Sequence, residues 1–223
     1  MSLKHLGIIA DGNRRWAKEN NLPKIEGHKK GLKTIEELVG AAAMAGIPYI
    51  TFYVFSTENW GREESEVDYI MKLAETRILK MAEKMAANNI KLVILGSRGK
   101  VNPTLTSLAE KAEKITAECT GTTVCFCFNY GGEQEIADAA NIAIETDGEI
   151  TPATIRKHLY HPEVPDLDMV VRTSGEERLS GFMLWRAAYA ELMFMKKYFP
   201  EMTSEDLKII LSEYDGRNRR FGK

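Results

Sequence analysis

Six short apolar runs, spaced along the whole chain, constrain its fold more than any other feature of the sequence. They are continuous rather than alternating, which is typical of strands covered on both faces of a parallel sheet. The runs occupy residues 6–10, 49–55, 90–96, 123–128 and 168–172, with a weaker one at 191–195. Helical patterns separate them, so we predict an α/β fold whose central, mostly parallel, six-stranded sheet is flanked by helices.

Three of the intervening segments have apolar residues at helical spacing: 66–89, 103–118 and 133–145. No linker rich in proline, glycine or serine divides the 223 residues, so residues 1–223 are predicted to form one domain. Methionine and alanine form a stripe along segment 66–89. This stripe is typical of ordinary core, and the alternative is the wall of an apolar channel.

The composition excludes several classes of protein. Cys125 and Cys127 alternate within the apolar run TTVCFCFNY, which favours buried structural thiols over a disulfide or a metal site. The formal net charge of −2 argues against a broad nucleic-acid surface. No apolar stretch approaches the ~20 residues of a membrane span. Asp11 interrupts the first run too early for a signal peptide, so we expect a cytoplasmic protein.

Polar segments follow the first five runs in turn: ADGNRRW, FSTENWGR, GSRGK, NYGGE and RTSGEER. The carboxyl ends of parallel strands share one edge of the sheet, and ligands of open α/β sheets bind outside that edge. We therefore expect one crevice to collect Asp11, Asn13, Arg14, Arg15, Ser56, Glu58, Asn59, Arg62, Arg98, Arg172 and Arg178.

The residue types in this crevice predict an anion-binding site. Arginine makes forked contacts to phosphate oxygens, a helix amino end offers free N–H groups, and Gly12 lets the backbone approach an anion. The plainer alternative is that Asp11 or Asn13 only caps a helix. His28 follows Gly27 and suits either phosphate contact or a structural role.

An acidic side chain beside a bound phosphate suggests a bridging Mg²⁺, which one or two carboxylates can hold together with phosphate oxygens. Asp11 is the first candidate ligand and Glu191 the second, although Glu191 taken alone is more typical of a surface or capping residue. The GxGxxG, Walker A and HExxH patterns do not occur, so dinucleotide, P-loop and zincin interpretations lack their signatures.

Four segments together resemble the cis-prenyltransferases, and most closely the bacterial undecaprenyl diphosphate synthases: residues 5–31, 52–62, 128–136 and 168–192. The resemblance implies a homodimeric, Mg²⁺-dependent enzyme with an apolar product tunnel. Such an enzyme adds isopentenyl diphosphate repeatedly, in cis, to an allylic diphosphate, usually farnesyl diphosphate. The expected product is a long-chain polyprenyl diphosphate such as undecaprenyl diphosphate, a lipid-carrier precursor for cell-wall synthesis. Its release implies transient contact with a membrane surface.

The resemblance also implies roles for individual residues. Asp11 would carry Mg²⁺ and help the allylic diphosphate to leave, with Glu191 as a second metal ligand. Asn59 is the proton acceptor by analogy, but a neutral amide is a weak base, so a positioning role suits it better. The substrate-binding set would be Gly12, Asn13, Arg14, Arg15, Trp16, Lys24, His28, Ser56, Thr57, Glu58, Trp60, Arg62, Arg172, Arg178, Leu179 and Ser180.

The chain departs from the family pattern in places. Ala10, Lys24 and Glu133 stand where methionine, arginine and arginine are usual, and the other departures are Glu63, Ser174 and Gly181. None of them removes a proposed catalytic group.

Two competing interpretations are a non-catalytic partner subunit, which should lack the equivalents of Asp11, Arg15 or Asn59, and a phosphate-ester hydrolase or phosphotransferase, which should show a nucleophile–base pair.

Overall fold

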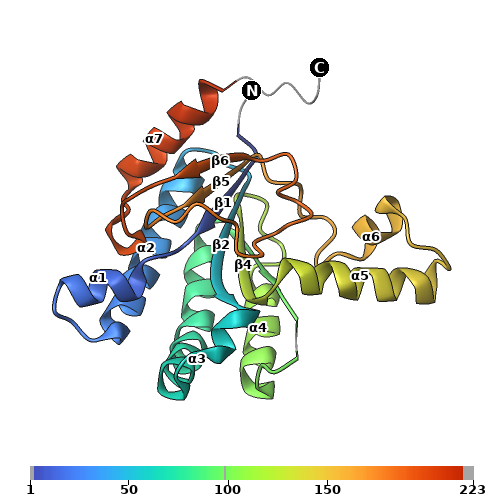
Figure 1. The fold of residues 1–223 in the computed structure, drawn as a ribbon, viewed down its shortest axis with the longest axis horizontal. Helices are drawn as coiled ribbons and strands as arrows, with labels where there is room; N and C mark the ends of the chain where they lie inside the picture. The colour runs from blue at the N-terminus through green and yellow to red at the C-terminus, as the bar shows by residue number, and fades with distance from the viewer. Residues whose placement is uncertain (1–2, 98, 218–223) are drawn as a thin grey trace.

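The computed structural model describes residues 3–97 and 99–217, and within them six strands form one all-parallel sheet (Figure 1). The strand order is β3-β4-β2-β1-β5-β6. The predicted fold class is confirmed, including the weak sixth strand. The strands are β1 (His5–Ile9), β2 (Tyr49–Ser56), β3 (Lys91–Leu95), β4 (Thr123–Tyr130), β5 (Met169–Arg172) and β6 (Glu191–Phe194).

The helices of the described residues are α1 (Asn13–Glu19), α2 (Lys24–Met44), α3 (Glu64–Ala87), α4 (Pro103–Ile115), α5 (Gly132–Thr146), α6 (Pro152–His158) and α7 (Ser204–Asp215). Two short 3-10 helices, η1 (Thr57–Gly61) and η2 (Phe199–Glu201), complete them. The three predicted helices appear as α3, α4 and α5. Helix α4 ends three residues earlier than predicted, and beyond its end the Thr116 hydroxyl accepts a hydrogen bond from the Leu92 N–H at 2.9 Å.

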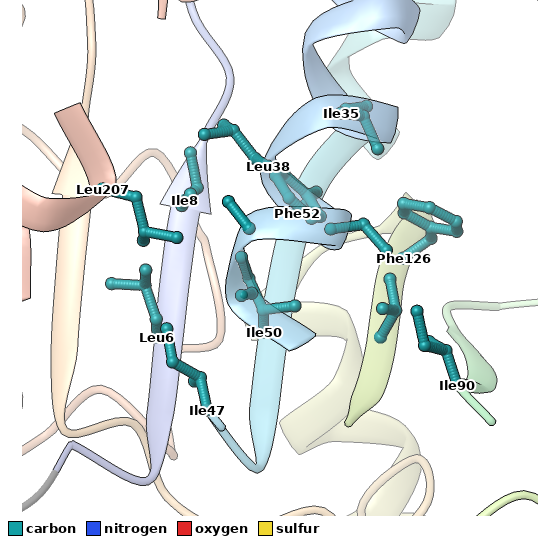
Figure 2. Close-up of a cluster of buried hydrophobic side chains, with 14 of the residues drawn as sticks. Leu6, Ile8, Ile35, Leu38, Ile47, Ile50, Phe52, Ile90, Phe126 and Leu207 are labelled. Atoms are coloured by element: carbon teal, nitrogen blue, oxygen red, sulfur yellow. The ribbon is translucent and has the colours of Figure 1, made fainter. Parts of the chain in front are cut away.

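Alternate residues of each central strand enter the apolar cores on the two faces of the sheet. Ile8 and Phe52 belong to the larger core, into which α2, α3, α4 and α7 also pack. Ile35 and Leu38 of α2 lie over the strands in this core (Figure 2). Ile9 lies in the second core, with Cys125 and Cys127. Burial on both faces explains why the runs are continuous, and both cysteines are buried free thiols, as predicted.

Parallel pairing brings the polar strand ends to one edge of the sheet. Ile9 lies opposite both Tyr53 and Arg172, and Tyr53 lies opposite Cys127, so the segments after β1, β2, β4 and β5 begin side by side. Helices α5 and α6 extend away from the sheet (Figure 1). None of the helices in the described ranges is long and apolar enough to cross a membrane.

Candidate active site

A polar crevice of about 990 Å³ opens at the carboxyl edge of the sheet. Its walls come from the ends of β1, β2 and β5, from α1 and α2, and from the start of α5. It brings together fourteen of the predicted site residues: Asp11, Gly12, Asn13, Arg14, Arg15, His28, Ser56, Thr57, Glu58, Asn59, Arg62, Arg172, Arg178 and Ser180. Arg98, also expected in the crevice, lies outside the described residues, and so does the terminal segment RRFG (219–222).

Four predicted substrate-binding residues do not line the crevice: Trp16, Lys24, Trp60 and Leu179. The indole N–H of Trp60 donates to the Asn129 side chain at 2.7 Å, and its ring packs edge-on against Phe55. Lys24 forms an ion pair with Glu63 at 2.8 Å. Leu179 packs against the second core, and Trp16 is half-buried on α1. Their roles in substrate binding stay predictions.

Asp11 follows β1, and its carboxylate is held by groups on both sides of the crevice. Oδ1 accepts from the Gly12 N–H at 2.7 Å and lies 3.2 Å from the Arg15 guanidinium. Oδ2 accepts from Arg172 at 2.9 Å. Burial opposes ionisation, but the hydrogen bonds and charges of Arg172 and Arg15 outweigh it and lower the pKa of the Asp11 carboxyl. Asp11 is therefore an anion at neutral pH.

Gly12 allows the sharp entry from β1 into α1. Its φ of +102° disfavours any residue with a Cβ, and a Cβ there would lie 2.6 Å from a ring carbon of Tyr198. The first hydrogen bond of α1 runs from the Trp16 N–H to the Gly12 carbonyl. The N–H groups of residues 13–15 lie before this bond. At the start of any helix, such groups have no carbonyl partner within the helix. The predicted helix start is confirmed, whereas the approach of an anion to Gly12 stays a prediction.

Arg172 links the two sides of the crevice. Besides Asp11, it donates to the Ser180 hydroxyl at 2.8 Å and to the Arg178 carbonyl at 2.6 Å. Its side chain is almost fully buried, with 5% exposed. Glu176 pairs with both Arg15 and Arg178. These two arginines lower the pKa of the Glu176 carboxyl, with Arg178 the larger influence.

Asn59 has a structural role in this arrangement. Its side-chain oxygen accepts a hydrogen bond from the Ser56 N–H at 3.2 Å, which caps η1. The residue still lines the crevice. An amide oxygen that accepts a backbone N–H holds the chain in place, which agrees with positioning rather than proton transfer.

Two acids that the sequence pattern does not single out, Glu66 and Glu176, contact the basic residues of the crevice. Glu66 is buried and contacts His28, Arg62 and Arg14. The only sequence signal was its spacing of four residues from Arg62, which is typical of any helical ion pair. Glu176 lies within the predicted segment RTSGEER, but its position among arginines did not show which of them it would pair with.

Glu191 and Asp11 lie at opposite edges of the sheet. It begins β6 opposite Met169, which in turn lies opposite Leu6, whereas Asp11 follows the other end of β1. Its carboxylate pairs with Arg217 at 3.0 Å. The structure thus does not bring the two predicted metal ligands together, because the register places Glu191 at the amino edge of the sheet.

Asp11 has the properties expected of a Mg²⁺ ligand. It is ionised, and it faces a crevice lined by several arginines. The described part of the chain contains no cluster of three or more His, Cys, Asp or Glu residues that could hold a metal ion by themselves. A cation at Asp11 would therefore take most of its ligands from phosphate oxygens and water, as Mg²⁺ commonly does.

A second, mainly apolar cavity of about 200 Å³ adjoins the crevice. It lies between the sheet and helices α2, α3 and α4. Ala74 and Met81 of α3 line it, whereas Met71 packs with Phe55, Val67 and Leu105 instead. The two cavities share a set of lining residues: Ala10, Asn13, His28, Tyr53 and Val54. The polar and apolar spaces therefore meet at these five residues, which we call the neck.

Sheet, crevice and cavity define an α/β protein with an arginine-rich polar crevice beside an apolar pocket. A model of the family described as "Putative undecaprenyl diphosphate synthase" matches residues 9–222. An isoprenyl transferase of Neisseria meningitidis serogroup B is 42% identical over 221 residues, which are 99% of this chain and 89% of that protein. One from Rickettsia bellii is 40% identical and covers 100% of this chain and 99% of its own. The chain belongs to the undecaprenyl diphosphate synthase family of prenyltransferases.

Solved structures agree with this assignment. A lavandulyl diphosphate synthase from Lavandula x intermedia, in complex with dimethylallyl diphosphate, superposes with a TM-score of 0.94 at 29% identity over 100% of this chain and 99% of that one. A "probable undecaprenyl diphosphate synthase" from Campylobacter jejuni gives 0.86 at 31% identity over 100% of both chains. The predicted family is confirmed, and the chain is an enzyme of the prenyltransferase class.

Proposed function

We propose that this prenyltransferase elongates an allylic diphosphate, farnesyl diphosphate in the first instance, by repeated cis condensation with isopentenyl diphosphate. The observation that carries the proposal is the neck shared by the polar crevice and the apolar cavity. A lipid diphosphate needs both environments, one for its charged end and one for its hydrocarbon. The product would be a long-chain polyprenyl diphosphate such as undecaprenyl diphosphate, which serves as a lipid-carrier precursor for the cell wall.

In this proposal the allylic diphosphate binds to the amides of residues 12–15 and to Arg15 and His28. Arg172, Arg178 and Ser180 would bind the second diphosphate. Breaking the allylic C–O bond places negative charge on the departing diphosphate, and fixed donors stabilise that charge where it develops. Arg172 already spans Asp11 and Ser180, so one guanidinium would connect the two diphosphate sites.

Formation of the new carbon–carbon bond requires orientation and exclusion of water. The apolar cavity would hold the hydrocarbon away from solvent and serve as the product tunnel. Asn59 would keep η1 and Ser56 in place, and the proton released from the isopentenyl group would pass to diphosphate or water.

The cofactor in this proposal is Mg²⁺, with Asp11 as the chain's ligand. When bound, the ion would help to neutralise charge on the diphosphate oxygens. Glu191 would be a second ligand only if a metal also binds at the amino edge of the sheet or near another subunit, since its register separates it from Asp11.

We further propose a homodimer that works in the cytoplasm and touches a membrane surface when it releases product. Strand β6 is an edge strand of the sheet. Tyr189, just before this strand, and Leu192, within it, are exposed apolar residues, which is compatible with a contact between subunits. Sedimentation at twice the 25.1 kDa mass of the chain would support the dimer.

Elongation is tested by incubating the purified protein with Mg²⁺, farnesyl diphosphate and labelled isopentenyl diphosphate, and then sizing the products. We expect polyprenyl products from the wild-type chain. Asp11→Ala should lower turnover by roughly a thousandfold, because the anionic ligand is lost, while its circular dichroism spectrum is retained. Release of phosphate without elongation would favour a hydrolase, and inactivity of the folded wild type would favour a non-catalytic subunit.

A further inference from the structure

Glu66 lies in the first turn of α3 with only 4% of its side chain exposed. Because the carboxylate is ionised, Oε1 accepts hydrogen bonds from His28 Nε2 at 3.2 Å and from the Arg62 guanidinium at 3.1 Å. Oε2 lies 3.6 Å from the guanidinium of Arg14. One buried carboxylate therefore meets basic groups from α1, from α2 and from the residue that ends η1.

The three basic side chains line the polar crevice, and His28 lines both cavities, whereas Glu66 lines neither. A group in this position acts on a ligand only through its neighbours. We propose that Glu66 is the positioning residue of the diphosphate subsite at the neck between the cavities. It fixes His28 and Arg62 in place and keeps Arg14 close to the same anion. This inference rests on the proposed function.

The electrostatics of the cluster explain why such a residue is needed. Burial lowers the pKa of His28 and of Arg62, and the charge of Arg14 lowers both further. The carboxylate of Glu66 opposes this effect on both groups through hydrogen bonds and charge. Without it, the guanidinium groups of Arg14 and Arg62 would repel one another, and His28 and Arg62 would lose the carboxylate that orients them toward an anion.

Oε2 of Glu66 has no hydrogen-bond partner among the described residues. A buried acceptor without a partner is unusual, and the Arg14 guanidinium is the cation that approaches it. The Arg14 side chain is 51% exposed. Arg14 can therefore move between Oε2 and a phosphate in the crevice, whereas His28 and Arg62 stay bound to Oε1.

The test uses Glu66→Gln, which keeps the shape and one acceptor but removes the charge. Glu64→Gln is the matched control, since Glu64 is exposed in the same turn of α3. Binding of inorganic pyrophosphate with Mg²⁺ should weaken about tenfold in Glu66→Gln and stay within about twofold in the control. The KM for the allylic diphosphate should rise by a similar factor, while the KM for isopentenyl diphosphate stays near wild type.

A second readout separates positioning from a purely structural role. In Glu66→Gln the pKa of His28, followed by NMR, should fall below its wild-type value because the imidazolium loses its carboxylate. Glu66→Asp, which keeps the charge, should bring both the His28 pKa and the affinity for pyrophosphate part of the way back to their wild-type values. If Glu66→Gln does not fold, Glu66→Asp carries the test with a smaller loss of pyrophosphate affinity.

Wild-type pyrophosphate affinity and wild-type His28 pKa in the folded Glu66 variants would overturn the inference. Equal losses in Glu66→Gln and Glu64→Gln would overturn it as well, because the effect would then be general to the start of α3. A wild-type protein that fails to elongate farnesyl diphosphate contradicts the proposed function instead, so the two failures can be told apart.

Discussion

At the residue scale, the crevice balances each cationic group against an acid. Asp11 is paired with Arg15 and Arg172, Glu176 with Arg15 and Arg178, and Glu66 with the basic groups at the neck. Arginines without partners would repel one another in a partly buried site. A diphosphate, with several acceptor oxygens, can replace Glu176 as the partner of Arg15 and Arg178.

Gly12 combines a positive φ with a close contact to Tyr198. Gly12→Ala should cost about 2–3 kcal/mol of unfolding free energy, since it combines backbone strain at positive φ with a steric clash at Tyr198. Gly46→Ala is the control: its φ is +69°, but no atom lies within 4 Å of the added Cβ, so it should cost only about 1 kcal/mol. Urea denaturation measures both, and equal losses would contradict the role given to the contact with Tyr198.

At the scale of elements, α3 takes part in both halves of the proposed site. Its first turn carries Glu66 beside the crevice, and its next turns line the apolar cavity. Helix α2 contributes His28 and Ile35 in the same way. The polar and apolar parts of the site are therefore built on the same two long helices, which pack on one face of the sheet.

Ala74 on α3 is the position at which product length should be most sensitive. Ala74→Leu adds apolar volume inside a cavity of about 200 Å³, so products should become shorter by at least one isoprene unit. Ala87→Leu, at the exposed end of the same helix, should leave the product lengths unchanged. Chromatographic sizing of labelled products measures this. Wild-type product lengths from Ala74→Leu would contradict the tunnel.

The sequence was sufficient to predict the sheet and most of the crevice, because continuous apolar runs and polar strand ends are local signals. It did not reveal contacts that depend on how distant elements pack. Trp60 donates to Asn129 across 69 residues, and Glu66 meets His28 only because α2 and α3 adjoin. The register of β6, which places Glu191 at the opposite edge of the sheet, likewise depends on pairing with β5.

At the scale of the whole molecule, the site depends on a sheet whose centre is completely buried. His5, in the central strand β1, is 0% exposed. Both ring nitrogens form hydrogen bonds. Nδ1–H donates to the Pro165 carbonyl at 2.8 Å, and Nε2 accepts from the Thr51 hydroxyl at 2.7 Å. Burial is the main cause that lowers the pKa of His5 to about 4.

Stability should therefore fall in mild acid. The folded pKa of about 4 lies below the value of 6.5 for an unperturbed histidine, so between these values the unfolded state binds a proton that the folded state does not. The free energy of unfolding should drop by about 3 kcal/mol from pH 6.5 to pH 4 on account of His5. Urea denaturation of wild type and His5→Gln measures the difference, and parallel pH curves for the two proteins would contradict it.

A crystal structure with Mg²⁺ and farnesyl thiodiphosphate, a slowly reacting analogue, would show directly where an allylic diphosphate binds. We expect the diphosphate to lie within hydrogen-bonding distance of Arg15 and His28. We also expect the hydrocarbon to pass Ala10 and enter the cavity between α2, α3 and α4. A diphosphate bound elsewhere, or a hydrocarbon that points away from that cavity, would rule out this mode of binding.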